Sequence, residues 1–157
     1  MTIRRLQPTD SIEDLTALIH RAYQRLGEMG LNYTAVNQGP EVTLERVLEG
    51  ECWLAEMHGA TVGTAVLSFP EPYRESGRAY VNQFAVEPDL QGMGIGSALL
   101  QHLEERAREV GCHEIGLDTA ESAGHLVRFY ETRGYQFVEY VQFEGKTYRS
   151  VILVKLL

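Results

Sequence analysis

The segment from residue 80 to residue 111 constrains the fold of this 157-residue chain more than any other. It begins with alternating apolar residues that predict a strand, and Pro88 ends that strand because proline cannot donate to a ladder. Three glycines follow within five residues, Gly92, Gly94 and Gly96. The next run predicts a helix to Gly111, with an apolar face of Ile95, Leu99, Leu103, Ala107 and Val110.

A glycine turn that leads into a helix is typical of an anion-binding site. Glycine has no Cβ, so the backbone can approach a ligand closely. The first helical turn leaves N–H groups unpaired at the positive end of the helix dipole. The segment therefore predicts a ligand that carries phosphate.

Two familiar phosphate-binding loops do not fit this segment. A nucleotide-triphosphate loop has a lysine and a Ser or Thr after its last glycine, whereas Ser97 and Ala98 follow Gly96 here. A dinucleotide loop has its third glycine three residues after the second, and Leu99 occupies that position if the first pair is Gly94 and Gly96.

The remaining pattern is Gln91-Gly92-Met93-Gly94-Ile95-Gly96, behind a strand that ends in Val86-Glu87-Pro88. It resembles the acyl-CoA pyrophosphate loop of the GNAT N-acetyltransferase superfamily. The alternative is a glycine turn that serves only as a connector. The resemblance implies that acetyl-CoA is the co-substrate of an acetyl transfer. It also implies that a strand bulge at residues 84–86 supplies a backbone N–H, which donates to the oxyanion that forms on the acetyl carbonyl during the transfer. The cofactor-binding residues it implies are Phe84, Ala85, Val86, Gln91, Gly92, Met93, Gly94, Ile95, Gly96, Ser97, Phe129 and Arg133.

A second segment, Phe129-Tyr130-Glu-Thr-Arg-Gly134-Tyr135, resembles another part of the same superfamily. The resemblance implies that Tyr130 is a catalytic general acid that protonates the departing CoA thiolate; the alternative is a tyrosine that only packs in the core. Many family members carry an asparagine seven residues before this tyrosine. Ala123 stands there in this chain, so either the asparagine's contact is missing or Ser122 provides a weaker substitute.

The resemblance implies one GNAT domain over residues 1–157. The fold class is α/β (α+β), with a mixed, mostly antiparallel sheet of about seven strands, a parallel pair in the middle and about four flanking helices. The residue patterns agree with this fold: they predict a parallel pair at about 78–87 and 113–118 and a helix at 121–133. They also predict two hairpins, at 52–69 and 134–157.

The acceptor and the general base are less well defined than the cofactor loop. Irregular stretches at 31–41 and 70–77 offer acceptor-site candidates, namely Asn32, Tyr33, Asn37 and Tyr73. No base is assigned; the carboxylates considered are Glu71, Asp118 and Glu121. Two arginines, Arg128 and Arg133, could meet the cofactor's phosphates, and His125 is the histidine expected near the groove.

Composition narrows the function classes. The net charge of −8 argues against a general nucleic-acid binder and slightly favours a cationic amine substrate. No apolar run approaches the ~18 residues that span a bilayer, and the N-terminus lacks an apolar signal segment. The two cysteines, Cys52 and Cys112, have no metal-type spacing, so we expect a cytoplasmic protein without a metal.

The sequence therefore predicts an acetyl-CoA-dependent N-acetyltransferase that acts on a primary amine of a small molecule, peptide or protein. The alternative is a non-catalytic acyl-CoA-binding sensor module. An acyl group longer than acetyl, a hydroxyl acceptor and a homodimer built on the final hairpin are left open.

Overall fold

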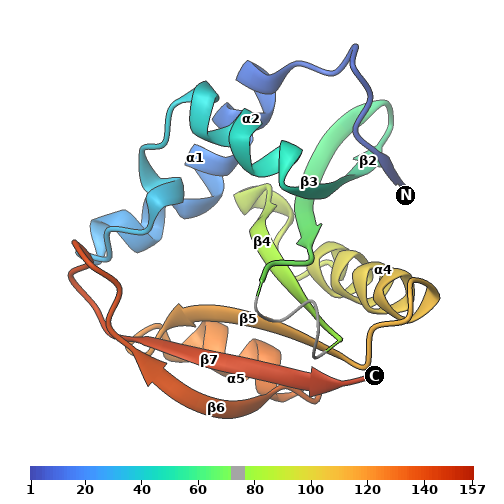
Figure 1. The fold of residues 1–157 in the computed structure, drawn as a ribbon. Coiled ribbons are helices and arrows are strands. Elements are labelled where there is room, and N and C mark those ends of the chain that lie inside the picture. Colours follow the sequence, from blue (N-terminus) through green and yellow to red (C-terminus); the bar gives the residue numbers. More distant parts are fainter. Residues whose placement is uncertain (72–76) are drawn as a thin grey trace.

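The computed structural model describes residues 1–71 and 77–157, which form a twisted sheet covered by helices (Figure 1). Within these residues, seven strands form one sheet in the order β1-β2-β3-β4-β5-β7-β6, and four α-helices flank it. The elements are β1 (Thr2–Arg5), α1 (Ile12–Glu28), η1 (Thr34–Val36), α2 (Pro40–Leu48), β2 (Gly50–Met57), β3 (Ala60–Ser68), β4 (Arg78–Val86), η2 (Pro88–Leu90), α4 (Ile95–Glu109), β5 (Glu114–Ala120), α5 (Gly124–Glu131), β6 (Gln136–Val141) and β7 (Ser150–Leu156).

The central pair of strands, β4 and β5, is parallel, and the other pairs of neighbours in this sheet are antiparallel. The predicted mixed sheet is therefore confirmed. The parallel pair is short: its last paired positions are Tyr80 and Gly116. Beyond them β4 continues to Val86 and β5 to Ala120, and Figure 1 shows the two strands diverging.

Strand β4 bends at a bulge next to this divergence. Thr64 of β3 pairs with Ala85, and Val66 pairs with Asn82, so Gln83 and Phe84 together oppose one residue of β3. Gln83 has a φ of 53°, a left-handed conformation that is uncommon for a non-glycine residue. The bulge was predicted at residues 84–86 and lies at Gln83 and Phe84 instead. Such an insertion kinks a strand and redirects its side chains.

The helices pack on opposite faces of the sheet because successive strand residues point in opposite directions. On β3, Val66 belongs to the core beneath α1 and α2, whereas its neighbours Ala65 and Leu67 belong to the core beneath α4 and α5. The predicted face of α4 is confirmed through Ala107, but Val110 is 44% exposed because it caps the helix rather than continuing it.

The helix predicted at 121–133 and the hairpin predicted at 134–157 differ in their bounds from the prediction. Helix α5 begins at Gly124 rather than at the predicted Glu121. The chain turns back just before it, because the N–H of Ala123 donates to the carbonyl of Ala120. The last strand begins at Ser150, and residues 142–149 form a loop before it.

Within the described residues, no helix is both long and apolar enough to cross a membrane.

Replacing Leu103 by alanine tests the core beneath α4, where this side chain is completely buried. We expect Leu103→Ala to lower the free energy of unfolding by about 2–5 kcal/mol, because a buried leucine leaves a cavity. The matched control is Leu48→Ala on α2, where the side chain is 75% exposed and we expect a change within about 0.5 kcal/mol. Chemical denaturation measures both, and equal effects would contradict this core assignment.

Candidate functional site

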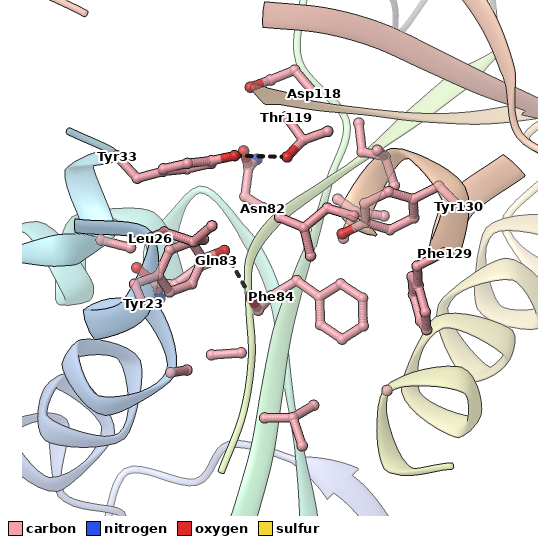
Figure 2. A pocket seen from close by; sticks show the side chains of 18 of the residues that line it. Tyr23, Leu26, Tyr33, Asn82, Gln83, Phe84, Asp118, Thr119, Phe129 and Tyr130 are labelled. Carbon is pink, nitrogen blue, oxygen red and sulfur yellow. Dashed lines mark hydrogen bonds between the residues drawn. The ribbon is translucent and has the colours of Figure 1, made fainter. Parts of the chain in front are cut away.

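A cavity of about 810 Å³ lies where β4 and β5 diverge. Side chains reach it from both sides of the sheet, and Figure 2 shows Tyr23 and Tyr33 opposite Phe129 and Tyr130, with Phe84 between them. The glycine turn, β5 and the loop before β7 complete its wall. The cavity therefore joins segments that are far apart in the sequence.

The glycine turn forms one end of this cavity and has the geometry of an anion site. Gly92 and Gly94 have φ values of 85° and 87°, which only glycine adopts without strain. A Cβ at either position would meet no atom within 4 Å, so the space in front of the turn is open. No side chain caps the start of α4, so its first N–H groups remain available to a ligand.

Arg133 lies beside the start of α4 although it follows α5. Its Nε donates to the hydroxyl of Ser97 at 3.0 Å, and its Nη1 donates to the carbonyl of Phe129 at 2.8 Å. The guanidinium also lies over the Phe129 ring, 3.7 Å from the centroid. These contacts hold a positive charge next to the uncapped helix, where it adds to the attraction for an anion.

The structure brings most of the predicted site residues together around the cavity. Met93 is an exception because its side chain is 63% exposed, and Ile95 is another because it packs in the core with Leu99. Only their backbone N–H groups could serve a ligand. The predicted residues that line the cavity are Phe84, Ala85, Val86, Gln91, Gly92, Gly94, Gly96, Ser97, Phe129, Tyr130 and Arg133.

Tyr130 lies on α5 and faces the cavity from the side opposite Tyr33 (Figure 2). Its ring packs edge-on against Phe129, with centroids 5.2 Å apart, and against Tyr135 at 5.8 Å. Its hydroxyl has no hydrogen-bond partner among the described residues. Burial raises the pKa of Tyr130 well above its ordinary value, so this phenol stays protonated at neutral pH.

Two tyrosines on the other side hold the diverging strands. The Tyr23 hydroxyl donates to the carbonyl of Phe84 at 2.8 Å, in the bulge of β4. The Tyr33 hydroxyl lies 2.8 Å from the Thr119 hydroxyl and accepts a hydrogen bond from the N–H of Ala120 at 2.9 Å, at the end of β5 (Figure 2). The polar role of Tyr23 has no signal in the sequence.

A buried polar network supports the bulge from behind. The Gln38 amide donates to the Gln83 side-chain oxygen and to the Thr43 hydroxyl, both at 2.8 Å. Gln83 is buried and lines the cavity, yet its Nε2 has no partner among the described residues. An unpaired buried donor of this kind calls for a partner that the described residues do not supply.

Charged side chains occupy the end of the cavity away from the glycine turn. Asp118 of β5 accepts a hydrogen bond from the Tyr80 hydroxyl. Burial raises the pKa of Asp118, while that hydrogen bond and the charges of Arg46 and Lys146 oppose the shift. Both cations line the same cavity. Arg46 and Lys146 belong to no sequence motif, so the sequence alone did not identify them as site residues.

Two other acceptor-site candidates, Asn32 and Asn37, lie outside the cavity. Asn32 bonds the backbone of the 142–149 loop through Gly145 and Thr147, and its side chain does not line the cavity. Asn37 does not line it either, because its N–H turns back to the carbonyl of Thr34. Tyr73 falls outside the described residues.

Comparison with known proteins agrees with this geometry. The profile of the Acetyltransferase (GNAT) family matches residues 13–135. The chain belongs to the GNAT family. It is therefore an acyltransferase, and its relatives are named as N-acetyltransferases.

One relative of this GNAT protein is the S-(2-succino)cysteine N-acetyltransferase of Bacillus subtilis (strain 168). It is 31% identical over 138 residues, which cover 83% of this chain and 82% of the relative. The glucosamine 6-phosphate N-acetyltransferase of Trypanosoma brucei brucei is 34% identical over 80 residues, about half of each chain. A GNAT acetyltransferase structure from Elizabethkingia anophelis, with acetyl-CoA bound, shares the fold, with a TM-score of 0.74 and 18% identity over 99% of this chain and 97% of that one.

This GNAT chain lacks the asparagine that many family members carry seven residues before the tyrosine corresponding to Tyr130. Ala123 is fully buried among Leu26, Leu31 and Ala120, and it has no polar group to offer. Ser122 is exposed and does not line the cavity, so it does not replace the asparagine.

The remaining polar candidates divide between the cavity and the surface. Glu121 pairs with Arg149 at 2.5 Å, and Glu71 is exposed and away from the cavity. Arg128 does not line the cavity, whereas His125 does, as predicted. Within the described residues, no group of three His, Cys, Asp or Glu side chains could hold a metal ion.

The hydroxyl of Tyr33 provides a test of how the end of β5 is held. We expect Tyr33→Phe to lower the free energy of unfolding by about 1–3 kcal/mol, because the N–H of Ala120 loses its acceptor. Tyr148→Phe is the matched control, since this ring stacks on Tyr33 at 4.9 Å and its hydroxyl has no hydrogen bond among the described residues. Denaturant unfolding measures the free energy of unfolding of both variants. An unchanged value for Tyr33→Phe would show that water replaces the tyrosine hydroxyl as acceptor for the N–H of Ala120.

Proposed function

We propose that this GNAT acyltransferase transfers the acetyl group of acetyl-CoA directly to a primary amine of a small molecule, peptide or protein. The observation that supports the proposal best is the joint position of two groups on one cavity. The uncapped start of α4, with Arg133 beside it, suits the cofactor's pyrophosphate, and Tyr130 lies further along the same wall. The acetyl-CoA-bound neighbour has the same fold.

The acceptor is a small molecule in both curated relatives, an S-substituted cysteine and an amino-sugar phosphate. These amines are therefore the first acceptors to test. Transfer requires the neutral amine to attack the thioester carbonyl carbon, which forms a C–N bond and breaks the C–S bond. Holding both substrates in one cavity replaces a bimolecular collision, which is worth up to about 7–11 kcal/mol in favourable cases.

The proposed mechanism gives two groups of this chain a part in that step. A backbone N–H of the β4 bulge, which Tyr23 and Gln38 hold in place, donates to the developing oxyanion. The Tyr130 phenol gives its proton to the departing thiolate and regains one from solvent. Asp118 is the carboxylate that lines the cavity among the described residues, and it is the candidate for taking the amine's proton.

The alternative is a sensor that binds acetyl-CoA without turnover. Ala123 favours it, because the family's asparagine is absent. The GNAT relatives named as enzymes favour catalysis. Release of free CoA thiol over a panel of amines, including S-(2-succino)cysteine and glucosamine 6-phosphate, separates the two functions: tight binding with no turnover on any amine would establish the sensor.

Gly94→Glu tests the pyrophosphate site. A carboxylate at the start of α4 repels an anion, so we expect CoA affinity to fall by at least about 100-fold in calorimetric titration. The matched control is Gly59→Glu in the β2–β3 turn, where φ is 78° and a Cβ would also meet no atom within 4 Å. It carries the same backbone strain and charge but should bind CoA normally. A folded Gly94→Glu protein with unchanged affinity would refute the site.

Tyr130→Phe tests the general acid. We expect kcat to fall about 10²- to 10⁴-fold while the KM for acetyl-CoA changes little, because the ring and its packing remain. Tyr140→Phe, at an exposed position on β6, is the control and should keep the parent kcat. Since burial raises the Tyr130 pKa above the ordinary tyrosine value of ~10, the parent rate should not decline through loss of this proton as the pH rises from neutral towards that value. An unchanged kcat in Tyr130→Phe would leave the residue a packing role only.

A further inference from the structure

The acceptor end of the cavity is positively charged in a protein whose net charge is −8. Arg46 comes from α2, and Lys146 comes from the loop between β6 and β7. Both line the cavity, and Asp118 is the one carboxylate among its described lining residues. Two cations therefore converge there from segments a hundred residues apart.

Arg46 is half-buried and has no ion pair or side-chain hydrogen bond among the described residues. Other arginines do have such partners: Arg4 pairs with Asp10, and Arg106 pairs with Glu51 at 2.9 Å. Taking a charge partly out of water without a partner is costly. Arg46 thus has the character of a group whose partner is a ligand, and its planar fork matches the two oxygens of a carboxylate or a phosphate.

The position of Arg46 follows from the buried face of α2. Thr43 lies one helical turn before it and is completely buried. Its hydroxyl bonds Thr16 at 2.7 Å and Gln38 at 2.8 Å, and Gln38 in turn bonds Gln83 on the cavity wall. Residues three apart share a helix face, so this network turns Arg46 toward the cavity.

Lys146 is held in place rather than left mobile. Its Nζ donates to the carbonyl of Asn32 and to the hydroxyl of Thr34, both at 2.9 Å, which leaves one N–H for a ligand. Burial and the nearby charge of Arg46 lower the pKa of Lys146. The two cations are therefore close enough to repel each other, and an anion between them would relieve that repulsion.

A third, uncharged donor lines the same cavity. The Gln83 Nε2 is buried without a partner among the described residues. It is independent of the two charges, and it also lacks an acceptor. Three donors of this wall, on α2, β4 and the 142–149 loop, thus have unfilled hydrogen-bonding capacity.

We propose that the acceptor amine carries a second, anionic group, a carboxylate or a phosphate, and that Arg46 and Lys146 bind it. The inference rests on the proposed function, since it describes the acceptor of the same transfer. Asp118 then lies on the side of the ligand that carries the amine, where its charge attracts an ammonium group before deprotonation.

Matched pairs of acceptors test this proposal. We expect methionine to exceed methioninamide by about 10- to 100-fold in kcat/KM expressed per neutral amine, the range that hydrogen bonds to a charged group supply. Rates are compared per neutral amine because the carboxylate raises the pKa of the neighbouring ammonium group. Phosphoethanolamine against ethanolamine tests the phosphate in the same way. A preference in either pair supports the proposal and identifies the anion. Equal rates for acid and neutral partners in both pairs would overturn it while leaving the N-acetyltransferase assignment intact.

Arg46→Gln then identifies the residue responsible. We expect the preference for the anionic partner to fall to below about threefold, with the KM for acetyl-CoA unchanged. Glu45→Gln is the control, because Glu45 is exposed on the same helix and does not line the cavity. If Arg46→Gln instead weakened CoA binding, the cations would serve the cofactor, and the proposal would be wrong. We choose Arg46 rather than Lys146 because Lys146 also ties two segments together.

A binding measurement makes the test independent of turnover. With the protein saturated with CoA, calorimetry compares N-acetylmethionine with N-acetylmethioninamide. Tighter binding of the acid, lost in Arg46→Gln, supports the anion site even if no tested amine is acetylated. Equal binding overturns the anion site, whereas failure of every amine in the thiol-release assay counts against the proposed transfer.

Discussion

The early end of the β4–β5 ladder is the constraint on which the rest of this structure depends. After three paired positions the strands separate, which opens the sheet at its centre rather than at an edge. An opening there exposes backbone N–H and C=O groups that a regular ladder would have paired. The cavity and its lining side chains lie around this opening, so the site is a consequence of unmade strand pairing.

Tyrosine hydroxyls satisfy part of that lost pairing. Tyr23 reaches the carbonyl of Phe84 on β4, and Tyr33 accepts the N–H of Ala120 on β5, so each strand is held from the α1 side by a ring rather than by its former neighbour. The rings also supply apolar surface to the cavity wall. The same residues therefore hold the strands and line the cavity, and a substitution there is best read with both stability and activity measured.

The sequence predicted the parts of the site that depend on local backbone chemistry. The turn at Gly92 and Gly94 is readable because its left-handed φ values need glycine, and the helix after it because its apolar residues recur with helical spacing. Arg46 and Lys146 were not predicted, since their proximity depends on how α2 and the last hairpin fold against the sheet. The start of α5 was misjudged because a local turn at Ala123 precedes the helix, and the start of β7 because the loop before it is tied to residues 30–34.

The loop at residues 142–149 is tied to residues 30–34 by the Asn32–Thr147 contacts and by Lys146. The strand that follows it, β7, lies between β5 and β6 instead of at an edge. Residues 30–34 are synthesised more than a hundred residues before Lys146 and Thr147, so their contacts with this loop form late in synthesis. β6 pairs with β7, so it acquires its partner strand in the described sheet only after β7 has been made.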